Sequence, residues 1–283
     1  MPCANPTLTI PTDIDAAVLN ALQEDVGSGD VTASLIPAQR LCNARVICRE
    51  TAVLAGAPWF DCVFRHLDPA VVVTWLHEEG AALARDDVVC RLAGPARAIV
   101  TGERTALNFL QTLSATATVT RDYVNALGET RTRVLDTRKT VPGLRSAQKY
   151  AVRAGGGVNH RMGLFDAILI KENHIAAAGS ISAAVGALRR SHPQLRIEVE
   201  VENMQDLDEA LANGVEMIML DNFDVVAMRV ATAHVAGRAQ VEISGGLELE
   251  ALAALGQIGA DFVSIGALTK HLRAVDFSMR IEA

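Results

Sequence analysis

The sequence predicts an α/β protein built around an incomplete (β/α) barrel, and three observations support this fold class. From about residue 131 onward, short apolar runs alternate with helical patterns, which is typical of a parallel sheet. No Gly-x-Gly-x-x-Gly motif follows the first run, so a dinucleotide-binding doubly wound sheet is not favoured. Each run ends in polar or small residues, and a barrel collects all of its strand ends at one face. Six runs are visible where a closed barrel has eight strands, so we expect the barrel to be incomplete.

Composition and charge exclude several classes of protein. The 283 residues suffice for one large domain or two modest ones, and because only 4% are aromatic, we expect a core of Ala, Val, Ile and Leu. The net charge of −7 argues against a surface that attracts nucleic acid as a whole. The N-terminus lacks the features of a signal peptide, and no apolar run is long enough to span a membrane. We therefore expect a cytoplasmic protein with neither a nucleic-acid nor a membrane partner.

The cysteines point to a reducing compartment. Their number is odd, none forms a Cys-x-x-Cys pair, and their spacing does not match a zinc site. We expect free thiols at all five positions, which are Cys3, Cys42, Cys48, Cys62 and Cys90.

The first third of the chain is expected to mix helices and strands, and the remainder to repeat strand–helix units. In the first third, we predict a helix over 13–22, a turn-rich loop over 24–32, strands over 45–49 and 71–76, short strands within 81–94, and a helix that begins near 102. The apolar runs of the barrel are 134–137, 167–171, 197–201, 217–221, 241–244 and 262–266. The helices of this part are expected over 144–154, 181–191, 204–213, 225–235 and 247–255.

The ends of the six barrel strands carry the residues that are best suited to bind a substrate or to act in catalysis. Any one of them could simply cap a turn or face solvent, but surface charge has no reason to gather at the same end of six strands. Two small-residue turns, 244–246 and 265–267, follow the last two strands, where barrels often bind phosphate through backbone N–H groups. Four basic side chains form a second group that suits a small polyanion: Arg138, His160, Arg161 and Lys171.

Two carboxylates at the same strand ends have several possible roles. Glu200 and Asp221 could accept hydrogen bonds from sugar hydroxyls, hold Mg²⁺ directly or through water, or stabilise a developing positive charge. A phosphate site, a second anion site, and groups for a polyol, a metal or a cationic transition state together fit phosphoribosyl transfer. The sugar carbon becomes cationic in that reaction as pyrophosphate leaves.

Seven long motifs occur along the chain in a fixed order: EDVGSGDVT (24–32), GERTALNFLQTLSATAT (102–118), DTRKTVPGLR (136–145), GGGVNHRMGLFDAILIKENHI (155–175), EVEVEN (198–203), MLDN (219–222) and EISGG (242–246). Over essentially the full chain, the sequence resembles the quinolinate phosphoribosyltransferase family, also called nicotinate-nucleotide pyrophosphorylase (carboxylating). The resemblance implies that quinolinate and phosphoribosyl pyrophosphate give nicotinate mononucleotide, pyrophosphate and CO₂, with Mg²⁺ as cofactor, in de novo NAD synthesis. A paralogous phosphoribosyltransferase with another acceptor is the alternative.

The resemblance also implies an architecture. It indicates an N-terminal open-faced α/β sandwich domain over 1–115, completed by a C-terminal tail over 272–283, and an incomplete α/β barrel over 116–271. The assembly it implies is a homodimer or a higher oligomer with active sites shared between subunits, in which Arg104 enters the site of the partner subunit.

By resemblance, catalysis is assigned to Lys139, Lys171, Glu200 and Asp221. These four and a further ten are assigned to substrate binding: Arg104, Thr137, Arg138, His160, Arg161, Ser244, Gly245, Gly246, Gly266 and Ala267. The basic side chains meet the quinolinate carboxylates, with Thr137 supporting the pyridine, and Lys139 lies near the pyrophosphate or ribose. Glu200 and Asp221 hold the ribose hydroxyls and the Mg²⁺-bound pyrophosphate, and the small residues cradle the 5′-phosphate.

Two hypotheses from other classes remain at this point. Lys171 at a barrel strand end could form a Schiff base with a carbonyl substrate, although the adjacent Glu172 does not favour the neutral amine. A nucleic-acid binder could use the basic residues of 131–153, but this stretch lacks interleaved aromatic side chains.

Overall fold

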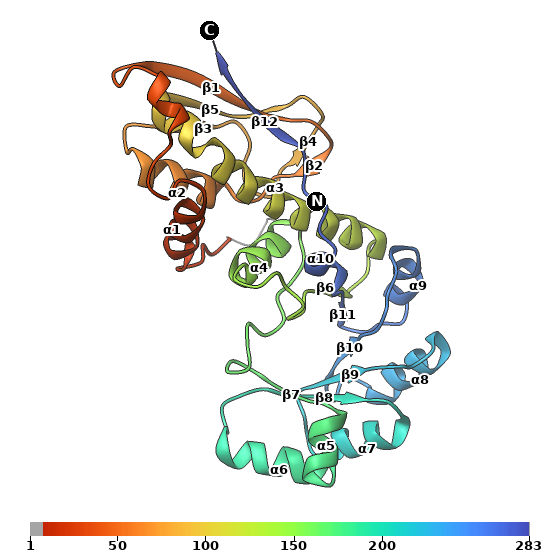
Figure 1. Ribbon diagram of the computed structural model, residues 1–283. Coiled ribbons are helices and arrows are strands. Elements are labelled where there is room, and N and C mark those ends of the chain that lie inside the picture. The colour runs from red at the N-terminus through yellow and green to blue at the C-terminus, as the bar shows by residue number, and fades with distance from the viewer. Residues whose placement is uncertain (1–7, 283) are drawn as a thin grey trace. The chain divides into compact units, whose positions relative to one another are not determined.

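The structure, a computed structural model, describes residues 8–282 and divides into two compact units (Figure 1). Unit 1 contains the chain up to Arg121, residues 140–156 and the chain from Ala267 onward, and unit 2 contains 122–139 and 157–266. The boundary expected at 115/116 stays a prediction, because these units divide the chain by contacts and not by family domains. Cys3 lies outside the described residues, and the other four cysteines are free thiols.

Unit 1 is built on a four-stranded antiparallel sheet with the order β12-β1-β5-β3. Its strands are β1 (Leu41–Cys48), β3 (Val72–Trp75), β5 (Val88–Pro95) and β12 (Phe277–Glu282). Arg45 lies opposite both Arg91 and Arg280 in register, and all three are exposed. Since side chains alternate between the faces of a sheet, this face is open while the other packs on the core. The shorter strands β2 (Ala52–Val53) and β4 (Ala82–Leu83) form a separate pair.

The helices of unit 1 bring aromatic residues into its core. They are α1 (Ile14–Asp25), the 3₁₀ turn η1 (Thr32–Leu35), α2 (Ala57–Leu67), the long α3 (Ala96–Leu127), whose residues from Asp122 onward belong to unit 2, α4 (Arg145–Ala154) and α10 (Ala267–Lys270). Helix α2 was not predicted, yet it has Pro near its start and buries Trp59, Phe60 and Phe64. The expectation of a purely small-aliphatic core is therefore wrong for unit 1, because the few aromatic residues are concentrated in it.

Unit 2 is a six-stranded parallel sheet with the order β6-β11-β10-β9-β8-β7. The strands are β6 (Arg133–Leu135), β7 (Ile168–Ile170), β8 (Ile197–Val201), β9 (Met217–Leu220), β10 (Gln240–Ile243) and β11 (Phe262–Ser264). All six match predicted apolar runs. Strands β6 and β7 are the two edges of this sheet, and Val158 forms an isolated parallel bridge to Leu135 beside β6. The barrel is therefore incomplete, as expected.

Helices follow the strands of unit 2 in the expected alternation. They are α5 (Glu172–Ala178), α6 (Ile181–Ser191), α7 (Met204–Ala212), α8 (Val225–Val235), the 3₁₀ turn η2 (Leu249–Ala251) and α9 (Leu252–Gly256). Side chains of Ser180, Asn203 and Asp224 cap the N-termini of α6, α7 and α8, which explains why these helices begin where the sequence predicts. Helix α5 was not predicted, and the helix expected over 247–255 is shorter. Among the described residues, no helix combines the length and apolar character needed to cross a bilayer.

Candidate active site

A cavity of about 160 Å³ lies at the carboxyl ends of the barrel strands. Its lining contains seven of the residues predicted to bind substrate: Thr137, Arg138, Lys139, His160, Arg161, Lys171 and Ser244. The remaining lining residues are Asp136, Leu169, Met219, Glu242 and Ser264. Because parallel strands end at the same edge of a sheet, residues more than 100 positions apart in sequence meet here.

The end of strand β6 is held in a defined conformation. Asp136 is fully buried, and its carboxylate accepts hydrogen bonds from the backbone N–H of His160 at 2.9 Å and from the side chain of Asn159 at 2.6 Å. The Thr137 hydroxyl accepts the backbone N–H of Lys139 at 3.0 Å. A Cβ at Gly266 would lie 3.0 Å from the Lys139 side chain, so glycine leaves room for that lysine. Asp136 is thus the buried anchor for the loop that carries His160.

Two strand ends and the segment between them contribute cations to the cavity: Arg138 follows β6, Lys171 follows β7, and Arg161 lies between these strands in the chain. Burial lowers the pKa of Arg161, and the nearby charge of Arg138 lowers it further. The Lys171 ammonium forms an ion pair with Glu200, which is itself nearly buried. Two neighbouring guanidinium groups in a partly buried cavity repel each other, and an anionic ligand would relieve this repulsion. Lys171 is paired with a carboxylate and is not the free amine that a Schiff base requires.

His160 lines the cavity, but its hydrogen bonds are those of a neutral imidazole. Its Nδ1 accepts the backbone N–H of Arg161 at 2.8 Å, so this nitrogen carries no proton. Its Nε2 lies 2.7 Å from Glu198 and therefore bears the ring proton and donates it. The sequence interpretation of His160 as one of the cations differs from this arrangement, because sequence shows the residue type and not the partners that choose the tautomer.

Beneath His160 lie two buried glutamates that the sequence interpretation missed. Glu198 and Glu242 are 5% and 0% exposed, and burial raises the pKa of Glu198 to about 7 and that of Glu242 to about 8, with the charge of Glu198 adding to the second shift. Within the described part of the chain, no well-placed hydrogen-bond donor reaches Glu198 Oε1 or either carboxylate oxygen of Glu242. The Ser264 hydroxyl lies near Glu242 and favours the ionised form of that carboxyl, but burial outweighs it. A proton held by one carboxyl supplies the missing donor to the other.

Three predicted site residues that do not line the cavity, Asp221, Gly245 and Gly246, lie at the carboxyl ends of β9 and β10. Asp221 directly follows β9 and is half-buried, and its backbone N–H bonds to Val201 at 3.0 Å, next to Glu200. Gly245 and Gly246 follow Ser244 and are exposed, and Gly245 has a φ of 139° that favours glycine. A Cβ at either glycine would meet no atom within 4 Å, so the turn borders open space.

Two predicted residues belong to unit 1. Ala267 begins helix α10, immediately after Gly266. Arg104 is exposed on helix α3. In addition, the basic residues of 131–153 do not form one solvated face, because Lys149 is 1% exposed, which removes the main feature of the nucleic-acid hypothesis.

Comparison with known proteins gives the family. The chain matches the models "Quinolinate phosphoribosyl transferase, N-terminal domain" over residues 30–114 and "Quinolinate phosphoribosyl transferase, C-terminal domain" over residues 116–280. The chain belongs to the quinolinate phosphoribosyltransferase family. A family relative from Mycobacterium leprae, named nicotinate-nucleotide pyrophosphorylase [carboxylating], is 41% identical over 280 residues, which cover 94% of this chain and 98% of the relative. The chloroplastic enzyme of the same name from Arabidopsis thaliana is 38% identical, with 95% and 83% covered.

Solved structures show the same quinolinate phosphoribosyltransferase fold. The nicotinate-nucleotide pyrophosphorylase from Francisella tularensis superposes with a TM-score of 0.94 at 41% identity, and the match covers 99% of this chain and 100% of that one. The open-faced N-terminal sandwich and the incomplete barrel expected from the sequence are both confirmed.

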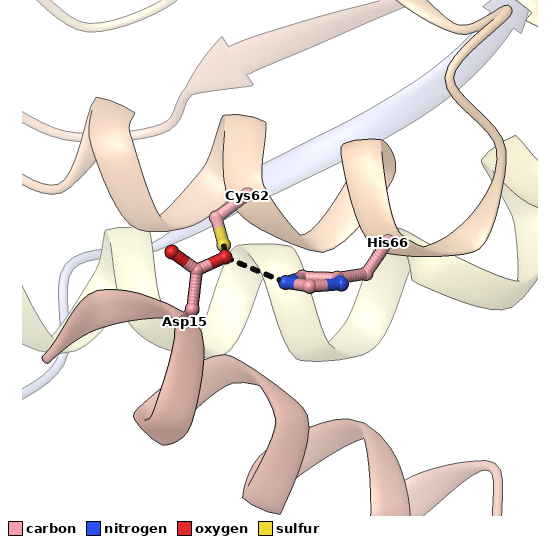
Figure 2. A group of neighbouring side chains, drawn as sticks. All are labelled: Asp15, Cys62 and His66. Atoms are coloured by element: carbon pink, nitrogen blue, oxygen red, sulfur yellow. Dashed lines mark hydrogen bonds and ion pairs between the residues drawn. The ribbon is translucent and has the colours of Figure 1, made fainter.

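A second cluster of ligand-type side chains lies in unit 1, between helices α1 and α2 (Figure 2). Asp15 Oδ1 is 2.8 Å from His66 Nε2 and 3.5 Å from Cys62 Sγ. The Arg65 guanidinium donates to the same carboxylate oxygen at 3.0 Å and to the Cys62 sulfur at 3.1 Å. A cation already lies against two of the three possible metal ligands, so we interpret this cluster as a link between the two helices and not as a metal site.

Proposed function

We propose that this chain transfers the phosphoribosyl group of phosphoribosyl pyrophosphate to the ring nitrogen of quinolinate and releases CO₂, yielding nicotinate mononucleotide and pyrophosphate. Membership of the family supports this reaction, as does one observation above all. Arg138, Arg161 and Lys171 come from three separate segments and line one cavity, while Glu200 lies near the carboxyl end of β8 and Asp221 follows the adjacent strand β9. A pocket of guanidinium and ammonium groups suits an acceptor with two carboxylates.

The proposed binding mode assigns each part of the two substrates to a part of the edge. The quinolinate carboxylates contact Arg138, Arg161 and Lys171, with Thr137 and His160 beside the ring. Lys139 lies near the pyrophosphate or the ribose, and the ribose hydroxyls contact Glu200 and Asp221. The open turn of Ser244, Gly245 and Gly246 after β10 receives the 5′-phosphate through backbone N–H groups, together with Gly266 and Ala267, which follow β11.

The donor set at this edge also fits a magnesium ion. Mg²⁺ in enzymes is usually held by one or two carboxylates together with substrate phosphates. Glu200 offers an oxygen that is shared with Lys171, and the side chain of Asp221 has no hydrogen bond or ion pair within residues 8–282. Asp221, with Glu200, would therefore hold the ion, and Mg²⁺ when bound would offset the charge of the departing pyrophosphate.

The residues of the chain act mainly by positioning and by electrostatics. The bond between the anomeric carbon and pyrophosphate breaks with its electron pair on the leaving oxygen, and the ring nitrogen donates its pair to that carbon. Glu200 and Asp221 stabilise the positive charge of the sugar in the transition state. The bond from the ring to the 2-carboxylate then breaks, CO₂ leaves, and the electron pair stays on a carbon next to the positive ring nitrogen, where a proton replaces CO₂. No covalent bond to the protein is needed.

We further propose a cytosolic homodimer or higher oligomer in which Arg104 of one subunit enters the partner's site. The exposed position of Arg104 on α3 leaves it available to a partner subunit, and the free thiols of the four described cysteines support a reducing compartment such as the cytosol.

The proposed function is tested by replacing Arg138. We expect Arg138→Ala to lower kcat/KM for quinolinate by about 10² to 10³-fold, since the charge that meets the acceptor is lost. The assay contains Mg²⁺, phosphoribosyl pyrophosphate and either quinolinate or nicotinate, and it measures CO₂ and mononucleotide. Arg133→Ala, an exposed arginine at the other end of β6, is the matched control and should keep its activity. Near-normal turnover in a folded Arg138→Ala variant, or a wild-type preference for nicotinate, would contradict the proposal.

A further inference from the structure

His160 and Arg161 occupy a junction between two cavities. Both residues line the proposed active-site cavity, and both also line a second cavity of about 180 Å³ that includes Glu198 and lies toward the amino ends of the strands. Glu198 comes from strand β8 and Glu242 from strand β10, and strand β9 lies between these two strands in the sheet. Neither glutamate was expected to have a role, and the mechanism above gives them none.

The His160 ring connects the buried glutamates to the backbone of Arg161. On one side its Nε2 lies 2.7 Å from Glu198 Oε2 and 3.5 Å from Glu242 Oε2. On the other side its Nδ1 accepts the Arg161 N–H at 2.8 Å. An imidazolium would carry a proton on both nitrogens and could not accept that N–H, and the opposite neutral tautomer would place two protons between Nδ1 and the Arg161 nitrogen.

The segment 159–161 is therefore held at two sides. Asp136 accepts the His160 backbone N–H and the Asn159 side chain, which fixes the segment to the end of β6. The His160 ring fixes the next peptide, that of Arg161, to strands β8 and β10 through the glutamates. The Arg161 guanidinium also donates to the carbonyl of Ala167, a residue that lines the second cavity, at 3.3 Å.

We propose that Glu198 and Glu242 are positioning residues, which hold His160 as the Nε2–H imidazole and thereby fix the backbone from which Arg161 reaches the acceptor. This inference rests on the proposed function for its kinetic consequence, but the tautomer of His160 does not depend on that function. Groups that orient a binding residue affect the substrate that this residue contacts. The effect is therefore expected on quinolinate and not on phosphoribosyl pyrophosphate, whose phosphate is assigned to the turns after β10 and β11.

The kinetic test compares a Glu198 variant that has no hydrogen-bond acceptor for His160 with one that keeps an acceptor oxygen. Glu198→Leu removes the nearer acceptor of His160 Nε2 and leaves only Glu242 of the pair, at 3.5 Å, and we expect KM for quinolinate to rise about 10-fold or more while KM for phosphoribosyl pyrophosphate changes less than about 2-fold. Glu198→Gln keeps an acceptor oxygen and should restore most of the quinolinate affinity. Glu216→Leu is the matched control, because Glu216 precedes β9 at the opposite end of the strands and accepts hydrogen bonds there. A rise in both KM values, no rise, or an equal rise in Glu216→Leu would overturn the inference.

The spectroscopic test needs no turnover. Long-range ¹H–¹⁵N spectra of histidine-labelled wild-type protein, with His160 assigned through His160→Asn, should show a protonated Nε2 and an unprotonated Nδ1. Observation of imidazolium or of the Nδ1–H form in the wild type would refute the inference even if Glu198→Leu fails to fold. If the wild type shows the expected tautomer but does not use quinolinate, the proposed function fails and the positioning of His160 stands. If it uses quinolinate but shows another tautomer, only the inference fails.

Discussion

Two clusters in this chain pair a histidine with carboxylates at nearly the same distance, yet their surroundings oppose each other. His66 lies 2.8 Å from Asp15, whose side chain is 60% exposed, and His160 lies 2.7 Å from Glu198, whose side chain is 6% exposed. Hydrogen bonds from His66, Arg65 and Cys62 lower the pKa of Asp15, whereas burial raises the pKa values of Glu198 and Glu242. The exposed cluster balances its negative charge with a cation, and the buried one does so with a proton. Burial and neighbours, not residue types, decide the charge state.

The largest expected difference between the clusters is in catalysis. His160→Ala should lower kcat/KM for quinolinate by about 100-fold, because His160 lines the cavity and holds the backbone of Arg161. His66→Ala should stay within about 2-fold of the wild type, since His66 only helps to link α1 to α2. Initial rates at saturating phosphoribosyl pyrophosphate measure both effects. Similar losses in the two variants would remove the functional distinction between the clusters.

The barrel and the upper layer of its site were predictable because the pattern is local. Short apolar runs, polar strand ends and intervening helical segments place Arg138, Lys171 and Asp221 at one edge without knowledge of any contact. The layer below was missed because only the strand tips were considered. In the sequence IEVEV, Glu198 lies two residues before Glu200 and so points to the same side of the strand, one layer deeper. The same spacing relates Glu242 to Ser244, so the two-residue period could have found both.

Other features depend on contacts that no local pattern records. The link between Asp15 and Arg65 exists because α1 packs on α2, and α2 itself was not predicted. The tautomer of His160 depends on Glu198, which is 38 residues away, as well as on its own neighbour. Long-range packing therefore determines charge states that the sequence alone leaves open.

The stability of the two clusters should depend on pH in different ways. The pKa of Glu242 is raised from 4.5 to about 8, so between these values the folded chain keeps a proton that the unfolded chain has lost, and stability falls as pH rises. Glu242→Gln removes this dependence. Since one pKa unit corresponds to about 1.4 kcal/mol, we expect the free energy of unfolding of the variant, relative to the wild type, to rise by on the order of 4 kcal/mol between about pH 5 and about pH 8.5. Urea unfolding at the two pH values measures the gain. A difference between variant and wild type that does not change with pH would contradict the shared-proton description.

The smallest expected effect belongs to the exposed cluster. Because the pKa of Asp15 is lowered, its contribution to stability is present above the unfolded value of 3.8 and is lost only as pH falls through the lower folded value. Asp15→Asn should therefore lower the Tm slightly and equally at about pH 5 and about pH 8.5. The loss should shrink when the ionic strength is raised from about 0.02 M to about 1 M, since salt screens exposed ion pairs, while the effect of Glu242→Gln should persist. Thermal unfolding of both variants at the two ionic strengths separates them. A loss for Asp15→Asn that is independent of salt would mean that the Asp15–Arg65–His66 link is shielded from solvent in the same way as the buried pair.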